Sequence, residues 1–276
     1  ATYADRMWLK LSPTKVGSWQ GCRRKFYLSY VAKERTGNAW AHLSYGNAVH
    51  AALRSWFDLP AEDRESDAIP GLVDRGWNDA GFKDAEQAAR WRARAAVIIR
   101  EYLDGIDPRF EPMSTERSLA FKTETFIMEG RIDRLDESDH EVAVVDYKTG
   151  RHAPSADEVR GSAALAMYAL MVQRCLGRPA FDVSLHHVPS GERISWRHSP
   201  ESLLRHERRI GQIAADISLA QDTWEAADGS PEVIDELFPA TPGPLCGFCD
   251  FWDLCAVGQA TAQRKEPWAG LGEDEA

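Results

Sequence analysis

The segment "VVDYKTG", Val144–Gly150, has the composition of a buried strand, but it carries an aspartate and a lysine two residues apart. Because the side chains of a strand alternate between its faces, Asp146 and Lys148 are expected on one face. The preceding predicted strand contains Asp133 within "EGRIDRLD". If the turn-like residues 136–140 make these strands neighbours, two carboxylates and a lysine share one pocket.

Two carboxylates at close range repel each other, and the pKa of one of them rises unless a cation lies between them. A hard divalent ion such as Mg²⁺ or Mn²⁺ suits carboxylate and water oxygens. It lowers the pKa of bound water, and Lys148 can then stabilise charge that develops on phosphorus. This set indicates phosphodiester hydrolysis. The alternative is an ordinary ion pair of Asp146 with Lys148 on a solvated strand face, because D-x-K alone is a common pattern.

Three further features accompany this pair. "YGNAVH" places His50 four residues after Gly46 on a predicted helix, so its imidazole is a candidate third metal ligand, although a lone helical histidine usually has a structural role. Gly130 stands three residues before Asp133 and allows close approach of another backbone or of substrate. Tyr168 lies on the predicted helix that follows the lysine strand.

The elements that must position these residues follow two hydrophobic periods. The first hundred residues have a helical period, which predicts two short helices around Cys22 and longer helices at 43–57 and 84–103. After Pro112 the period becomes two, which predicts an antiparallel three-stranded meander at 115–122, 125–136 and 141–148.

The C-terminal half is predicted to continue as helix, two strands and helix. The helix ends at Gly177, and the later helix begins at Ser199 and Pro200. The predicted ranges are 161–177 for the first helix, 181–188 and 192–198 for the strands joined by "PSG", and 199–224 for the second helix. Residues 264–276 are expected to form a disordered tail.

Composition supports a packed and soluble chain of 276 residues, with 43% hydrophobic residues and ten tryptophans. The net charge of -10 excludes a surface coated in positive charge but leaves room for a local basic groove. Basic runs at 22–25, 90–94 and 205–209 are most simply solvated helix faces. The apolar runs are shorter than the roughly 20 residues of a membrane span, and a signal pattern is lacking, so we expect a cytoplasmic protein.

The five cysteines do not suggest a disulfide framework in a cytosolic chain. Cys175 lies in an apolar helix pattern and is predicted to be a core thiol. The other four, C-x2-C-x5-C together with a distant partner, indicate either a zinc site or an iron–sulfur cluster that nearby aromatic residues shield from water. These four are Cys22, Cys246, Cys249 and Cys255, and the aromatic residues are Phe248, Phe251 and Trp252.

The ordered motifs G-x3-H, G-x-I-D, D-Y-K-T and a helical tyrosine, over residues 46–168, resemble the RecB-type nuclease branch of the PD-(D/E)XK superfamily. With the cysteines, the chain is similar over 22–255 to the iron–sulfur nucleases of that branch, which include the CRISPR-associated RecB-like exonucleases and the nuclease module of AddB. The resemblance implies an α/β fold, a restriction-endonuclease-like core in which helices flank a central mixed sheet. It implies a single domain over 1–263, with a helical roof at 42–105, a catalytic sheet with helices at 112–224 and a cysteine region at 246–255.

The resemblance also assigns roles to individual residues. It implies metal ligation by His50, Asp133 and Asp146, catalysis by these aspartates with Lys148, and positioning of DNA or of the lysine by Tyr168. It further implies one [4Fe-4S] cluster on Cys22, Cys246, Cys249 and Cys255. Two positions depart from the family pattern, which has Gln at the place of Ala164 and commonly has proline at the place of Arg23.

The function that follows from the resemblance is an Mn²⁺- or Mg²⁺-dependent DNA exonuclease acting at single-stranded ends. A roof over the pocket admits a single strand more readily than a duplex, and Arg90 and Arg94 are candidates to line the passage. The alternatives are a catalytically silent DNA-binding or scaffold subunit and a redox iron–sulfur protein. The chain lacks a G-x4-G-K-[ST] loop, so any ATP-driven motor must be a partner, such as a helicase of a repair or CRISPR adaptation complex.

Overall fold

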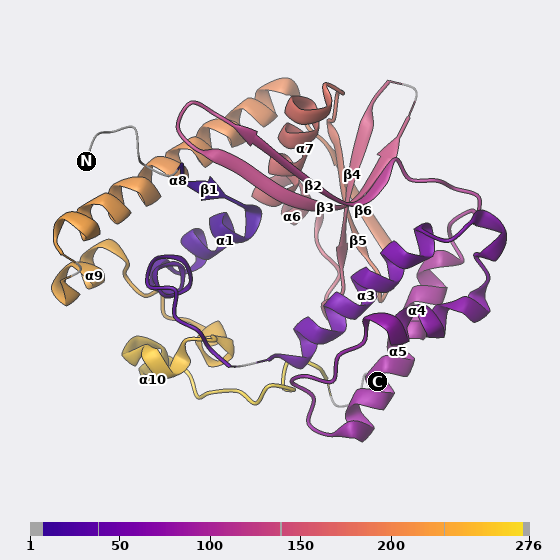
Figure 1. Cartoon of the computed structure of the whole chain (residues 1–276), viewed down its shortest axis with the longest axis horizontal. Coiled ribbons are helices and arrows are strands. Elements are labelled where there is room, and N and C mark those ends of the chain that lie inside the picture. Colours follow the sequence, from indigo (N-terminus) through magenta and orange to yellow (C-terminus); the bar gives the residue numbers. More distant parts are fainter. Residues whose placement is uncertain (1–7, 38, 139, 229, 273–276) are drawn as a thin grey trace.

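A computed structural model gives the structure of the chain and describes residues 8–37, 39–138, 140–228 and 230–272. A six-stranded mixed sheet lies at its centre (Figure 1). The strand order is β1-β3-β4-β5-β6, with β2 pairing with β3. The strands are β1 (Lys10–Leu11), β2 (Ser114–Lys122), β3 (Ile127–Glu137), β4 (Val142–Lys148), β5 (Asp182–His187) and β6 (Glu192–Arg197).

Helices cover both faces of this sheet, which confirms the expected α/β architecture. The helices α1 (Pro13–Gly21), α7 (Ala163–Leu176) and α8 (Pro200–Ala226) pack on one face, and Val144 is one of their contacts on β4. The helices α3 (Ala41–Phe57), α4 (Ile69–Gly76) and α5 (Ala85–Leu103) pack with Val145 and Tyr147 on the other face. The remaining helices are α2 (Arg23–Phe26), which continues as a π-helix over Tyr27–Val31, α6 (Ala156–Gly161), α9 (Pro231–Leu237) and α10 (Ala256–Thr261).

Strand pairing around β3 changes along its length and opens the sheet at one place. The antiparallel pairing of β3 with β4 extends as far as Arg134 opposite Val145. At the N-terminal end of β3, Ile127 and Met128 pair in parallel with β1. Beyond Val145, β4 continues to pair with β5. The strands β3 and β4 therefore separate directly at Asp133 and Asp146.

The predicted meander and the later hairpin are confirmed, and so is the helix predicted at 161–177, which is α7 and begins two residues later than predicted. Ser162 has extended backbone (φ -65°, ψ 110°) between α6 and α7, and its hydroxyl accepts a hydrogen bond from the amide of Leu165. Ser162 is therefore the N-cap of α7. Gly177 ends α7 in the left-handed region (φ 63°), as its sequence position predicted.

Two features of the fold differ from the sequence-based expectation. Helix α4 was not predicted, because the short segment "IPGLVDRG" combines a proline with two glycines. The prediction that Cys175 is a core thiol is wrong, because this residue is exposed. Its Sγ lies 3.5 Å from the carbonyl oxygen of Ala120 on the outer strand β2.

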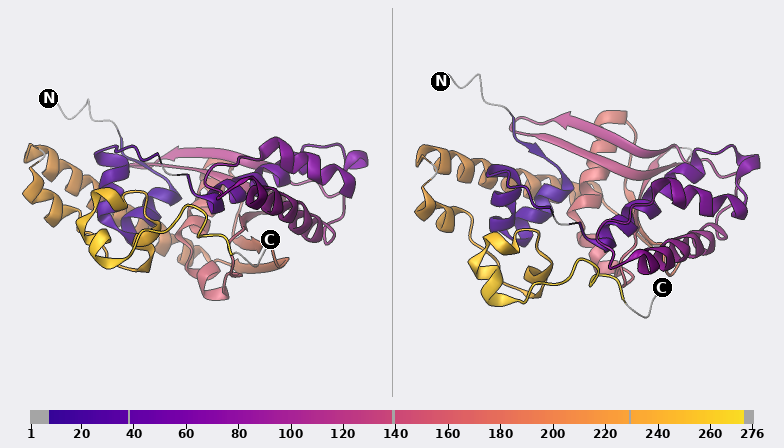
Figure 2. Two further views of the ribbon diagram at one scale, coloured as in Figure 1. Left: turned by 90° about the horizontal axis from the view of Figure 1, so that it is seen from below. Right: turned by 60° about the horizontal axis from the view of Figure 1, so that its bottom comes forward.

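The C-terminal segment 264–272 is ordered, which contradicts the expected disordered tail over these residues; 273–276 lie outside the described ranges. The amide of Lys265 donates to the carbonyl oxygen of Gly247, and the carbonyl of Pro267 accepts from the amide of Ala41 at the start of α3. Leu271 is buried among the residues of α3 and α5. This segment thus runs from the cysteine region to the α3–α5 layer (Figure 2). We call 264–272 the C-terminal strap.

Helix α8 contains 27 residues and is amphipathic, with Ile210, Ile213 and Ile217 among its buried residues. Neither α8 nor any other helix in the described ranges combines the length and the apolar character that a membrane span requires.

Candidate active site

The two predicted aspartates meet where β3 and β4 separate. Asp133 Oδ2 accepts a hydrogen bond of 2.8 Å from the main-chain amide of Tyr147. Asp146 immediately precedes Tyr147 and follows Val145, which belongs to the last residue pair shared with β3. The expectation that both carboxylates lie at one end of the meander is therefore met by the strand register.

Asp146 is buried, with 8% of its surface exposed. It forms an ion pair with Lys148, whose Nζ lies 2.6 Å from Asp146 Oδ2. Burial and then the charge of Asp133 raise the pKa of Asp146, against the opposing charge of Lys148. An ordinary solvated ion pair does not have these properties.

His50 reaches the same place from α3. Its Nδ1 lies 3.4 Å from Asp133 Oδ1, and its ring meets the ring of Tyr147 edge-on at 5.8 Å between centroids. Burial lowers the pKa of His50, but the hydrogen bond and charge of Asp133, followed by the charges of Asp146 and Glu116, outweigh burial and raise it. The electrostatic potential at the His50 imidazole is therefore strongly negative.

Glu116 belongs to the site, although the sequence did not single it out. One ligand atom each from His50, Glu116 and Asp133 lies within 4.8 Å of the others. Glu116 stands opposite Asp133 in the β2–β3 pairing, between Thr115↔Arg134 and Arg117↔Ile132, and has a positive φ of 48°. A non-glycine residue in this region is strained, and such strain concentrates at functional sites.

The geometry of these five side chains agrees with the comparison to known families. A family profile described as the PD-(D/E)XK nuclease superfamily matches residues 10–256. The chain belongs to this superfamily. No curated protein sequence matches the chain significantly.

Solved structures that are similar to this PD-(D/E)XK chain include the following two. A "Putative exonuclease" from Eubacterium rectale shares 10% identity at a TM-score of 0.48, over 76% of this chain and 79% of that chain. SSO0001 shares 14% identity at a TM-score of 0.32, over 88% of this chain and 94% of that chain.

The side chains of the site fit the divalent metal that PD-(D/E)XK nucleases use. His50, Glu116 and Asp133 offer one nitrogen and two carboxylate donors, a set that suits Mn²⁺ and, less well, Mg²⁺. The buried carboxylate of Asp146, paired with Lys148, is a further candidate ligand. Asp146 is not part of the 4.8 Å group, so its ligation remains a prediction.

The glycines of the two motifs make room for side chains. A Cβ on Gly46 would lie 2.9 Å from Thr149 Oγ1, so this glycine lets α3 approach the loop after Lys148. A Cβ on Gly130 would lie 2.8 Å from Met171 Cε and 3.0 Å from Tyr168 Cε1. The neighbours of Gly130 are thus side chains of α7 rather than the backbone or substrate that we expected.

Tyr168 lines the same cleft as the acidic residues. Burial, followed by the charges of Asp146 and Asp133, raises its pKa, so the phenol keeps its proton and can donate a hydrogen bond. Ala164, the position at which the resemblance implied glutamine, lies one turn earlier on α7 and offers only an apolar methyl group.

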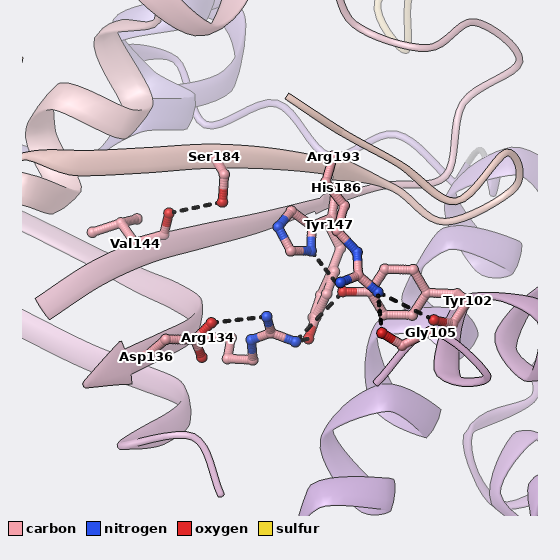
Figure 3. Close-up of polar contacts among 9 residues, drawn as sticks. All are labelled: Tyr102, Gly105, Arg134, Asp136, Val144, Tyr147, Ser184, His186 and Arg193. Atoms are coloured by element: carbon pink, nitrogen blue, oxygen red, sulfur yellow. Dashed lines mark hydrogen bonds and ion pairs between the residues drawn. The ribbon is translucent and has the colours of Figure 1, made fainter. Parts of the chain in front are cut away.

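A buried polar network holds Tyr147, the residue between Asp146 and Lys148 (Figure 3). Arg134 Nη1 lies 3.3 Å from the Tyr147 hydroxyl, and Arg134 Nη2 lies 2.8 Å from Asp136 Oδ2. The Tyr102 hydroxyl lies 2.6 Å from His186 Nδ1. Because Tyr147 contacts both His50 and Asp133, this network fixes the backbone and ring on which the acidic site depends.

A cleft of about 1240 Å³ contains the site. Its size exceeds the roughly 300–1,000 Å³ of small-molecule pockets, which favours a polymeric substrate. Arg94 lines it as predicted, whereas Arg90 pairs with Glu86 at 3.2 Å on the exposed side of α5. Its walls come from α1, α3, α5, β2, β3, β4 and α7, from the loop at 149–151, from Pro189, Leu245 and Phe248, and from the C-terminal strap.

The four predicted cluster cysteines come together from both ends of the chain. The amide of Thr241 donates to Cys22 Sγ at 3.4 Å, and the carbonyl oxygen of Thr241 lies 3.9 Å from Cys246 Sγ. Burial raises the pKa of Cys249, and the neighbouring Cys22 adds to the rise. The four thiols therefore share one region of the fold.

Cys255 joins this group through Gly258. Cys255 Sγ accepts a hydrogen bond of 3.3 Å from the amide of Gly258, and a Cβ on Gly258 would lie 3.9 Å from Cys246 Cβ. Within the described ranges, no three of the cysteine Sγ atoms lie within 4.8 Å of one another. Tetrahedral zinc with Zn–S bonds of about 2.3 Å requires sulfurs separated by about 3.8 Å.

Proposed function

We propose that this chain is a divalent-metal-dependent deoxyribonuclease that degrades DNA from single-stranded ends. The observation that carries the proposal is the convergence of His50, Glu116 and Asp133 within 4.8 Å, beside Asp146 and Lys148, at the point where β3 and β4 separate. A metal bound by these residues supplies an activated water and polarises the scissile phosphate.

The other side chains act around that metal. Lys148, half exposed at the mouth of the cleft, is placed to orient the attacking water or to stabilise charge on phosphorus. The Tyr168 hydroxyl is available to hold Lys148 or a phosphate oxygen. The network around Tyr147 keeps His50 and Asp133 in place, because orientation errors of about 1 Å are costly in catalysis.

A preference for single-stranded ends is supported by the walls of the cleft. Helix α3, the sheet, Leu245, Phe248 and the C-terminal strap all line the cleft. The strap is joined to α3 through the bond between Pro267 and Ala41 and through the buried Leu271. A chain that must pass between these walls enters by a free end more readily than by its middle.

We also propose the RecB-like branch and one [4Fe-4S] cluster on Cys22, Cys246, Cys249 and Cys255. The approach of the cysteines to one another around Thr241 and Gly258 supports a shared metal, and the resemblance to the iron–sulfur nucleases favours a cluster over a single zinc ion. The proposed role of the cluster is to hold the two chain ends together, because closing so long a loop stabilises the fold.

The decisive experiment incubates cluster-loaded protein and Mn²⁺ or Mg²⁺ with end-labelled single-stranded DNA, end-labelled duplex and circular single-stranded DNA. We expect degradation of the linear single strand, with the circle resistant. Rapid cutting of the circle would contradict end dependence while leaving nuclease activity in place. Binding without products in either metal would favour a silent DNA-binding subunit.

A further inference from the structure

One wall of the cleft is apolar and open to solvent. Leu245 is 78% exposed and Leu43 is 54% exposed, and both line the cleft that contains the metal-binding side chains. Each exposed leucine alone is unremarkable on a protein surface. Leu43 and Leu245 lie about two hundred residues apart in the sequence, yet both are exposed in one cleft. An exposed apolar surface of this kind favours binding of an apolar ligand.

Aromatic side chains lie close to these leucines in the sequence, and their rings lie near one another. The ring of Phe248 lies 5.8 Å from Trp40 and 6.4 Å from His42 between centroids, and Trp40 and His42 are 6.0 Å apart. Phe248 and His42 also line the cleft, and both are partly exposed. Burial lowers the pKa of His42, against the charge of Asp250, which favours the neutral ring. We call Leu43, His42, Leu245 and Phe248 the apolar wall.

The apolar wall is held in place by both ends of the chain. Trp40 Nε1 donates a hydrogen bond to Asp250 in the cysteine region. The C-terminal strap places Gly270 against the His42 ring, where a Cβ would lie 2.4 Å from Nδ1. The wall is therefore a fixed surface rather than a loop that must fold around its ligand.

Charged groups line other parts of the same cleft. Arg94 and Lys148 are among its lining residues, and so are the carboxylates of the metal site. A cleft with cations and a metal site in one part and an apolar, aromatic surface in another matches the two sides of a nucleotide chain, the phosphates and the bases.

We propose that the apolar wall contacts the unpaired bases of the DNA strand whose backbone lies at the metal site. This inference rests on the proposed nuclease function. Base faces are available in a single strand and are covered by neighbouring pairs in a duplex, so the wall would contribute to single-strand preference. Because every base has a π-face, the contact is expected to be tolerant of sequence.

The test separates contacts with bases from contacts with phosphates. Fluorescence anisotropy in Ca²⁺ compares an oligothymidylate with an abasic phosphodiester strand of the same length, for wild type and for Leu43→Ser combined with Leu245→Ser. Both leucines are exposed, so folding is not at risk. We expect roughly tenfold weaker binding of the oligothymidylate by the double variant, with binding of the abasic strand unchanged.

Phe248→Leu is a second variant that keeps apolar volume but removes the ring, and we expect it to weaken oligothymidylate binding as well. Leu219→Ser is the matched control, because this residue is 67% exposed on α8 and is not among the lining residues of the cleft. Equal losses for both strands, or no loss for either, would overturn the inference. Wild-type protein that binds neither strand contradicts the nuclease proposal itself, so the two failures are distinguishable.

Discussion

The main-chain amide of Tyr147 donates a hydrogen bond to the side chain of Asp133 across 2.8 Å. In a continued antiparallel ladder this amide would be satisfied by a main-chain carbonyl of β3. The carboxylate takes that place because the two strands separate after Arg134 and Val145. One hydrogen bond therefore satisfies this main-chain donor where the pairing ends and orients a carboxylate of the proposed metal site.

Replacing Asp146 with asparagine should abolish cleavage while leaving the fold intact. The amide keeps the shape of the side chain but removes the charge that binds a metal, so we expect at least about a hundredfold loss of rate. The measurement is the cleavage rate of labelled DNA beside the thermal unfolding midpoint. Asp157→Asn is the control, because Asp157 pairs with Arg160 on the surface. A wild-type rate in purified Asp146→Asn protein would remove this strand from the mechanism.

Replacing Glu116 should weaken metal binding, whereas its replacement by glycine should also stabilise the fold. Glu116→Gln keeps the size of the side chain, and we expect Mn²⁺ affinity to fall at least about tenfold in calorimetric titration. Glu116→Gly also removes the carboxylate but accepts the positive φ of 48° without strain. We expect relief of the strain to raise the free energy of unfolding by about 1 kcal/mol in EDTA. Loss of the ion pair between Glu116 and Arg131 reduces this gain.

The control for Glu116 is Glu124→Gln, a change of the same kind at an exposed turn position between β2 and β3. Unchanged Mn²⁺ affinity in Glu116→Gln would show that the residue does not serve the metal. A lower free energy of unfolding in Glu116→Gly would show that the carboxylate stabilises the strand more than the backbone strain costs.

Acid should destabilise the protein through His186. Burial and the charges of Arg134 and Arg193 lower its pKa from 6.5 to about 3. Between these values the unfolded chain binds a proton that the folded protein does not. Stability is therefore lost as the pH falls below about 6.5, by about 1.4 kcal/mol per pH unit from this residue. Urea unfolding at several pH values should show a smaller slope in His186→Gln.

The exposed His152 provides the comparison for His186, and His152→Gln should keep the wild-type slope. His198, whose pKa burial lowers to about 4, adds a similar dependence that remains in both variants. An unchanged slope in His186→Gln would mean that the imidazole is not held neutral in the network.

The sequence predicted those parts of the site that depend on alternation along a strand. The period-two pattern placed Asp146 and Lys148 on one face, and a short turn made β3 and β4 neighbours, so Asp133 and Asp146 came together as expected. Glu116 was missed because its position depends on the positive φ at that residue and on the pairing of β2 with β3. The residue types in this part of the sequence predict neither feature.

The errors at Cys175 and in the C-terminal strap have a common physical cause. An apolar helical period predicts one buried face, but it does not show how far along the helix that face is covered, and Cys175, next to the last residue of α7, is exposed. The strap contains polar residues and a proline, a composition typical of a disordered tail. It is held by the bond between Pro267 and Ala41 and by burial of Leu271, contacts that join residues more than two hundred positions apart.

Gly130→Ala should destabilise the protein and slow cleavage. The new methyl group would lie 2.8 Å from Met171 Cε and 3.0 Å from Tyr168 Cε1, so these two side chains of α7 must shift. We expect a loss of about 1–3 kcal/mol in the free energy of unfolding. Gly211→Ala is the matched control of opposite sign, because a Cβ there meets open space within α8, and a gain of up to about 1 kcal/mol is expected. Equal effects of the two changes would argue against the packing role of Gly130.

The cysteines allow a test of the proposed cluster that does not depend on nuclease activity. Iron, zinc and acid-labile sulfide are measured per chain in anaerobically purified wild type and in serine variants of Cys22, Cys246, Cys249 and Cys255. We expect iron and sulfide to fall in each variant, with solubility and thermal stability falling before cleavage, because the thiols join the chain ends.

Cys175→Ser is the internal control, since its thiol is exposed beside Ala120 on β2 and does not belong to the group around Thr241 and Gly258. Its iron content should match that of the wild type. Stoichiometric zinc without sulfide in the wild type would contradict the cluster and would still leave the acidic site as a nuclease centre. Loss of iron in Cys175→Ser alone would mean that the four thiols have been assigned wrongly.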